Sequence, residues 1–149
     1  MGRRRLSREV PDFVKWTPEF FVTVCCERRG LDQLCDARVA CGLLASVRHR
    51  QDLGQWGVDL ARIMPDHVQF VLSMRPGHDL LKTVRVWKRY ATTHFGVKWQ
   101  KDFFDHRLRS RESADQKFVH VLENPVRAGL CEKSEDWPYL LRGWDEFVP

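Results

Sequence analysis

The sequence has no continuous run of about 18 or more apolar residues, the length that a membrane-spanning helix requires. The basic start, MGRRRLSREV, is not followed by the apolar segment of a signal peptide, so we expect no membrane partner. No Cys-x-x-Cys pair occurs among the five cysteines, which excludes the zinc and redox motifs built on that pair. The cysteine usage therefore indicates a reduced, cytoplasmic protein without a disulfide framework.

Tyrosine is scarce, with only Tyr90 and Tyr139, whereas large apolar side chains are plentiful. Six Trp and nine Phe, within 43% hydrophobic residues, suffice for one core in a chain of 149 residues. The formal net charge of +5 permits nucleic-acid binding but does not establish it.

The spacing of apolar residues predicts strands and helices in alternation. We expect strands at residues 20–27, 56–64 and 67–74, which are rich in β-branched and aromatic residues. We expect helices at 36–51, at 79–95 and at 113–124, the last beginning at a Ser113–Gln116 capping box and ending at Pro125. This order predicts an α+β, ferredoxin-like or RRM-like antiparallel sheet with helices packed on one face. It divides the chain into a basic arm (1–18), a central domain (19–130) and a C-terminal tail (131–149) that packs on the domain.

The segment MPDHVQFVLSM, residues 64–74, places His67 and Gln69 on the same side of a strand, because side chains two residues apart face the same way. In the third helix, His120 and Asn124 are four residues apart and share one face. If that helix lies over the strand, His67, Gln69 and Asn124 meet. One imidazole nitrogen with two amide oxygens suits Mg²⁺ or Mn²⁺ better than zinc. The alternative is an ordinary solvated histidine and an asparagine at a helix end.

Basic residues recur in the N-terminal arm, on the second helix and around residues 98–111, and we expect them to contact the phosphates of a nucleic acid. The alternative is that they only keep the surface soluble. Four aromatic residues lie among them and either stack on unpaired bases or belong to the core, which we expect for most of them. The candidate phosphate contacts are Arg3, Arg4, Arg5, Arg85, Lys88, Arg89, Lys101 and Arg107, and the aromatic residues are Trp87, Trp99, Phe103 and Phe104.

Three blocks, MPDHVQFVLSM, WQKDFFDHRLR and ENPVRAGLCEKSEDWPY, together resemble the REP-associated tyrosine transposases, single-strand transposases of the HUH endonuclease superfamily. The resemblance implies a ferredoxin-like fold and binding of single-stranded or hairpin DNA by a monomer or homodimer. It also implies metal-dependent strand cleavage and rejoining through a phosphotyrosine. His67 and Asn124 match the family's metal ligands, and Gln69 stands where the family has a second histidine.

The resemblance places the nucleophilic tyrosine one helical turn before Asn124, where this sequence has His120. Three alternatives follow. The protein binds DNA without cutting it, as a nucleic-acid-binding module of a different functional class. Or His120 attacks the phosphate itself. Or Tyr90 or Tyr139 reaches the site from another element. An RNA-binding role on an RRM-like sheet is disfavoured, because the polar face of residues 67–74 carries no aromatic side chain.

Overall fold

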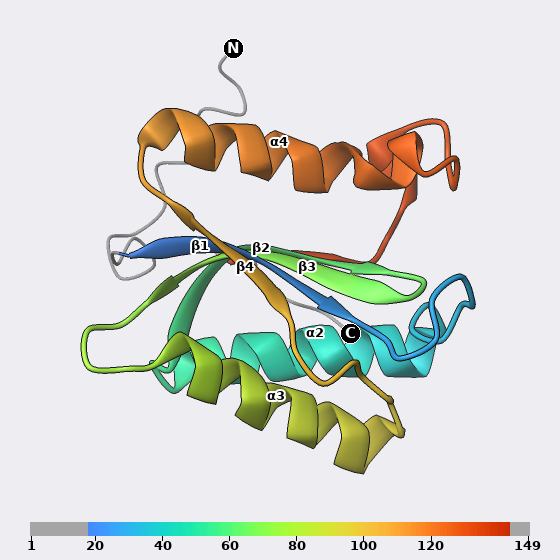
Figure 1. The fold of residues 1–149 in the computed structure, drawn as a ribbon. Helices are drawn as coiled ribbons and strands as arrows, with labels where there is room; N and C mark the ends of the chain where they lie inside the picture. The colour runs from blue at the N-terminus through green and yellow to red at the C-terminus, as the bar shows by residue number, and fades with distance from the viewer. Residues whose placement is uncertain (1–17, 144–149) are drawn as a thin grey trace.

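The computed structural model describes residues 18–143, and the fold is a five-stranded antiparallel sheet with three helices (Figure 1). In chain order the elements are β1 (Glu19–Cys25), α2 (Ala37–Asp52), β2 (Trp56–Met64), β3 (His67–Met74), α3 (Leu80–Phe95), β4 (Phe104–Leu108), α4 (Arg111–Arg127), the 3-10 helix η2 (Ser134–Asp136) and β5 (Leu140–Arg142). The strand order is β4-β1-β3-β2-β5. The predicted α+β fold class is confirmed. Within residues 18–143, no helix is both long and apolar enough to cross a bilayer.

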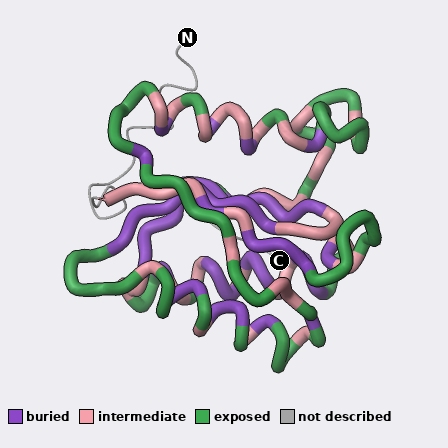
Figure 2. Tube along the Cα trace, in the orientation of Figure 1, coloured by how far each residue is buried: buried purple, intermediate pink, exposed green. Residues whose placement is uncertain are grey.

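The helices form two layers, because α2 and α3 cover one face of the sheet while α4 crosses the other (Figure 1). The expectation that all helices pack on one face is therefore wrong for α4. The physical reason lies in the central strands, which are apolar toward both sides: Phe70 packs in the α2–α3 layer, whereas Val71 packs under α4. Figure 2 shows this two-sided burial along the middle of the sheet.

The larger core is organised by aromatic rings. The ring centroids of Trp56, Phe70 and Trp87 lie 5.2 to 6.4 Å apart. Both indole nitrogens find acceptors inside the core, since Trp87 donates to the Ser46 hydroxyl at 2.9 Å and Trp56 to the carbonyl of Val47 at 3.1 Å. Trp87 is thus a core residue and is not available to a base.

The smaller core under α4 holds this helix against the sheet. Phe118 and Val121 from α4 pack on Leu60, Val71 and other residues of the sheet face. The helix begins earlier than predicted, because the capping residue is Ser110, whose hydroxyl accepts the backbone N–H of Ser113. It also continues two residues past Pro125, which lies inside the helix and is buried. The backbone N–H of Ala128 still reaches the carbonyl of Asn124 at 2.9 Å, so the last turn is closed.

The C-terminal segment contributes a strand of its own. Leu140–Arg142 pairs antiparallel with β2 and forms the edge of the sheet opposite β4. The indole of Trp137 donates to the carbonyl of Ile63 at 2.8 Å and so fastens the segment before this strand. The N-terminal arm, with the exception of residue 18, lies outside the described residues.

Candidate functional site

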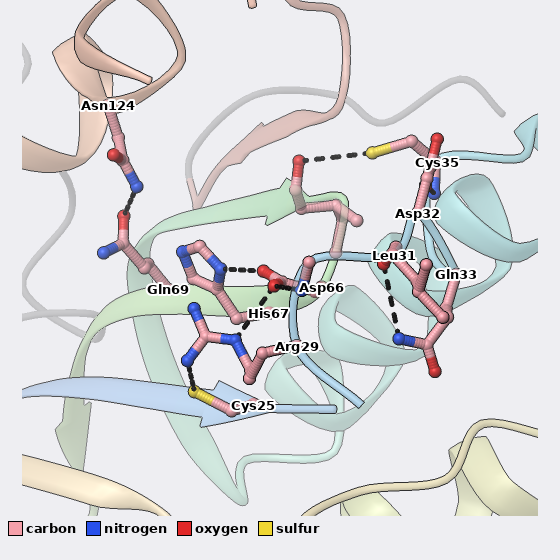
Figure 3. Close-up of polar contacts among 12 residues, drawn as sticks. Cys25, Arg29, Leu31, Asp32, Gln33, Cys35, Asp66, His67, Gln69 and Asn124 are labelled. Atoms are coloured by element: carbon pink, nitrogen blue, oxygen red, sulfur yellow. Dashed lines mark hydrogen bonds and ion pairs between the residues drawn. The ribbon is translucent and has the colours of Figure 1, made fainter. Parts of the chain in front are cut away.

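The turn between β2 and β3 carries a carboxylate that organises its surroundings. Asp66 accepts hydrogen bonds from the backbone N–H of Gly30 at 2.7 Å, from Nε of Arg29 at 2.9 Å and from Nδ1 of His67 at 2.8 Å (Figure 3). Burial alone would raise the pKa of Asp66, but the bonds from Arg29, Gly30 and His67 outweigh it and hold the pKa well below its usual range. Asp66 is therefore ionised at all ordinary pH values.

This carboxylate fixes the tautomer of His67. An ionised carboxylate can only accept a hydrogen bond, so Nδ1 of His67 carries the proton that it donates to Asp66. The other ring nitrogen, Nε2, lies on the side of the ring away from Asp66 and carries the lone pair in the neutral form of the ring (Figure 3). Metal-binding histidines are commonly held in this way by a carboxylate behind the ring.

Helix α4 brings an amide side chain across to the same strand. Nδ2 of Asn124 donates to Oε1 of Gln69 at 2.8 Å, although 55 residues separate the two in the sequence. Gln69 lies two positions after His67 on β3, so both side chains face α4. The structure thus brings together the strand and the helix end on which the three predicted ligands lie (Figure 3).

The donor set formed by His67, Gln69 and Asn124 fits a hard divalent ion, though it contains no carboxylate. It offers Nε2 of the imidazole and the carbonyl oxygens of two amides, which Mg²⁺ and Mn²⁺ accept in proteins. One of these oxygens, Oε1 of Gln69, accepts a hydrogen bond from Asn124. In residues 18–143, no group of three His, Cys, Asp or Glu side chains is placed so that it could hold a metal ion. Metal binding stays a prediction.

His120 lies one helical turn before Asn124 and faces β1. Its ring meets that of Phe21 edge-on, with 5.9 Å between centroids. Burial, aided by the charges of Lys117 and Arg127 and opposed by Glu123, lowers the pKa of His120 below its ordinary value. The imidazole is therefore neutral at pH 7, and Nδ1 lies 3.4 Å from Nη1 of Arg127.

A buried guanidinium lies beneath the helix. Arg62 on β2 is directly opposite Gln69 on β3, and only 1% of it is exposed. It donates to the carbonyl of Leu122 on α4 at 3.2 Å and to the carbonyl of Trp137 at 3.1 Å. Burial lowers its pKa to about 10, and its Nε has no hydrogen-bond partner among the described residues. Arg62 therefore places a positive charge and a structural link under the last turns of α4.

The structure does not bring either tyrosine to α4. Tyr90 belongs to α3, in the layer on the other face of the sheet, where it stacks on His94 with 4.0 Å between ring centroids. Tyr139 packs against the core of that same layer and contacts Trp137 edge-on. Because the sheet separates this layer from Asn124, the alternative in which Tyr90 attacks at this site disagrees with the geometry.

The eight predicted phosphate contacts fall into three groups: one buried residue, four exposed residues and three outside the described residues. The prediction that Lys88 contacts phosphate at the surface is wrong. Lys88 is only 8% exposed, and its Nζ donates to the carbonyls of Gln100 and Lys101 at 2.8 and 3.0 Å. Its helical spacing placed it on the basic face, but the loop after α3 folds over it. The exposed residues of the set are Arg85, Arg89, Lys101 and Arg107, and Arg3, Arg4 and Arg5 lie outside the described residues.

Three charged residues near the site, Arg29, Arg62 and Asp66, were not among the functional residues predicted from the sequence. Asp66 had a detectable signal, since it directly precedes His67 in a turn. Arg29 and Arg62 had no such signal, because Arg29 lies in a loop and Arg62 lies inside a strand, and neither belongs to a recognisable motif. Only the fold shows that both charges lie near β3.

No protein-family model matches the chain. It is 26% identical over 80 residues to the REP-associated tyrosine transposase of Escherichia coli (strain K12), covering 52% of this chain and 48% of that protein. It is 26% identical over 98 residues to a candidate REP-associated tyrosine transposase of Haemophilus influenzae, covering 52% of this chain and 53% of the relative. The chain thus spans about half the length of these curated relatives.

Solved structures show the same fold. A REP-associated tyrosine transposase bound to a REP hairpin superposes with a TM-score of 0.72 at 21% identity, covering 89% of this chain and 81% of the other. A candidate transposase from Deinococcus radiodurans superposes with a TM-score of 0.52 at 20% identity, covering 68% of this chain and 88% of the other.

Proposed function

We propose that this chain, a relative of the REP-associated tyrosine transposases, binds single-stranded or hairpin DNA beside α4 without forming a phosphotyrosine. The observation that carries the proposal is the meeting of α4 with β3: Asn124 contacts Gln69 at 2.8 Å, while the position one turn earlier holds His120 and no hydroxyl. The relative of known structure is bound to a REP hairpin, which supports DNA of this kind as the ligand.

Charge around the site supports a phosphate ligand. Arg29, half of whose side chain is exposed (51%), holds its guanidinium beside His67 through Asp66. Lys117 lies over the ring of Phe21 at 5.0 Å, and the exposed Arg127 follows Asn124 on α4. Side chains of this type neutralise backbone phosphates, so we expect the affinity for DNA to fall steeply as salt concentration rises.

His67, Gln69 and Asn124 are the residues that would hold Mg²⁺ or Mn²⁺, and Asp66 would orient His67 toward the ion. A bound ion would supply charge neutralisation at a phosphate oxygen. The protein itself contributes a neutral imidazole at His120 and the fixed charges of Arg29 and Arg62. None of these groups provides the tyrosine oxygen that the family uses, so binding rather than covalent capture is the activity that the residues support.

The test uses a labelled DNA hairpin with unpaired flanks, in Mn²⁺ and in EDTA. We expect a shifted band on a native gel and no covalent adduct on a denaturing gel. We further expect His120→Tyr to gain an adduct in Mn²⁺, because α4 would then present a hydroxyl one turn before Asn124. Salt-independent binding, or no binding, would overturn the proposal.

An adduct formed by the unaltered chain would also overturn it, and its chemistry would show which alternative holds. An acid-labile adduct lost in His120→Ala would indicate a phosphohistidine. An acid-stable adduct lost in Tyr90→Phe or Tyr139→Phe would indicate a tyrosine from another element.

A further inference from the structure

An aromatic ring projects into solvent on the edge strand of the sheet. Phe104, the first residue of β4, is 66% exposed, more than any other large apolar side chain among the described residues. Its neighbour Phe103 packs against the main core, so the chain buries one ring of the pair and presents the other. Single exposed apolar residues are common in proteins, so exposure alone does not indicate a function for Phe104. The position of Phe104 in the sheet does.

Phe104 stands at the end of a row that crosses four strands. It pairs with Thr23 on β1, Thr23 pairs with Gln69 on β3, and Gln69 pairs with Arg62 on β2. Directly paired residues of antiparallel strands point to the same face. Two strand spacings separate the backbone of Phe104 from that of Gln69, or roughly 10 Å. The ring therefore lies on the α4 side of the sheet, two strands from the Gln69–Asn124 contact.

The surroundings of this row favour an anionic polymer over a second copy of the chain. The loop before β4 carries the exposed Lys101, and β4 itself and the residue after it expose Asp105, Arg107 and Arg109. Charged side chains along an edge strand discourage pairing with another strand. The positive charges among them attract phosphates. Proteins that bind single-stranded nucleic acid without sequence preference combine such charges with exposed aromatic rings.

We propose that Phe104 is a stacking platform for an unpaired base of the bound DNA, with the adjoining phosphate directed toward β3. This inference rests on the proposed DNA binding and adds to it a specific subsite for a single-stranded flank. The double-stranded stem would lie elsewhere, so the contribution of Phe104 depends on the flank alone.

The experiment compares Phe104→Ala, Phe104→Trp and the unaltered chain on two hairpins, one with an unpaired flank and one blunt, by fluorescence anisotropy. Leu81→Ala, which removes an exposed apolar side chain from α3, is the matched control. We expect Phe104→Ala to bind the flanked hairpin roughly 5- to 150-fold more weakly, the range found for losing one base stack. We expect it to bind the blunt hairpin within twofold of the unaltered chain, and Phe104→Trp to keep tight binding.

A 2-aminopurine placed in the flank gives an independent signal. Its fluorescence should be quenched on binding the unaltered chain and less so on binding Phe104→Ala. Equal affinity of Phe104→Ala and the unaltered chain for the flanked hairpin would overturn the subsite while leaving hairpin binding intact. Loss of a dimer in Phe104→Ala, seen by gel filtration, would overturn it in favour of a second copy of the chain. Failure of every variant to bind either hairpin would overturn the subsite together with the proposed function.

Discussion

Replacing Asp66 by alanine should destabilise the fold substantially, because one carboxylate ties the loop after β1 to the turn before β3. The substitution removes three hydrogen bonds, from Gly30, His67 and Arg29. Bonds to a charged acceptor contribute about 1.5 to 3 kcal/mol each when shielded from water. The side chain of Arg29 is 51% exposed and returns to water, so its bond counts for about 1 kcal/mol at most. Because 14% of the Asp66 side chain is itself exposed, we take the lower end of this range, about 1.5 kcal/mol, for each of the bonds from Gly30 and His67. With the smaller contribution of Arg29, we expect a total loss of about 3 to 4 kcal/mol.

Urea denaturation followed by circular dichroism measures this loss as a lower midpoint at an unchanged slope. A loss of this size corresponds to a drop of roughly 10 °C in the melting temperature of a chain this long. Glu132→Ala is the matched control, since this carboxylate is exposed, and it should stay within about 0.5 kcal/mol of the unaltered chain. A loss below about 0.5 kcal/mol for Asp66→Ala would refute the reasoning.

The same contribution has a defined pH dependence. The pKa of Asp66 is held well below its usual range in the fold, whereas an aspartate in the unfolded chain titrates near 4 (about 3.9). The unfolded chain therefore binds the extra proton first as the solution is acidified. The stability due to Asp66 is complete above about pH 4 and declines as the pH falls from there toward the low folded value. The difference between Asp66→Ala and the unaltered chain should shrink over that interval, and a difference that stays constant would contradict the assignment.

Three further outcomes are expected. Phe118→Ala, in the core beneath α4, should cost about 3 to 5 kcal/mol in urea denaturation, and a cost below about 1 kcal/mol would mean that α4 is loosely held. Lys88→Ala should lower stability by about 1 to 3 kcal/mol, because two carbonyls lose their donor, yet leave the salt dependence of DNA binding unchanged; a shallower salt dependence would restore Lys88 as a phosphate contact. Mn²⁺ should raise the melting temperature of the unaltered chain, and Asn124→Ala should abolish the increase; an equal increase in both would place the metal elsewhere.

The strands β2 and β3 and the start of α3 were predictable because the relevant physics is local, whereas β4 and β5 were not among the predicted strands. β2 and β3 occupy the predicted ranges 56–64 and 67–74, since dense β-branched residues flank a Pro-Asp turn. Asp79 caps α3 through the N–H of Leu81, as its position before an amphipathic stretch indicates. The predicted start of α4 at Ser113 was wrong. Both Ser110 and Ser113 are residue types that cap helices, and only the extended backbone at Ser110 shows which of them is the cap.

The site was predictable only in part. The spacing of His67 and Gln69 showed that they share a face, and the resemblance pointed to Asn124, but the face of the sheet that α4 occupies was misjudged. Val71 and Ser73 lie on the same side of β3 as His67 and Gln69, and both are buried. A strand that is buried on both faces requires cover on both. The contacts of Asp66 with Arg29 and Gly30 span 36 to 37 positions, so no local pattern reports them.

The guanidinium of Arg62 joins three parts of the molecule that the sequence keeps far apart. It extends from β2, and its two terminal nitrogens donate separately to the carbonyls of Leu122 and Trp137. The last turns of α4 cannot move outward without breaking the bond from Arg62 to Leu122. A substitution or ligand that displaced the Arg62 side chain itself would break both bonds, and would therefore loosen α4 and the segment leading to β5 together.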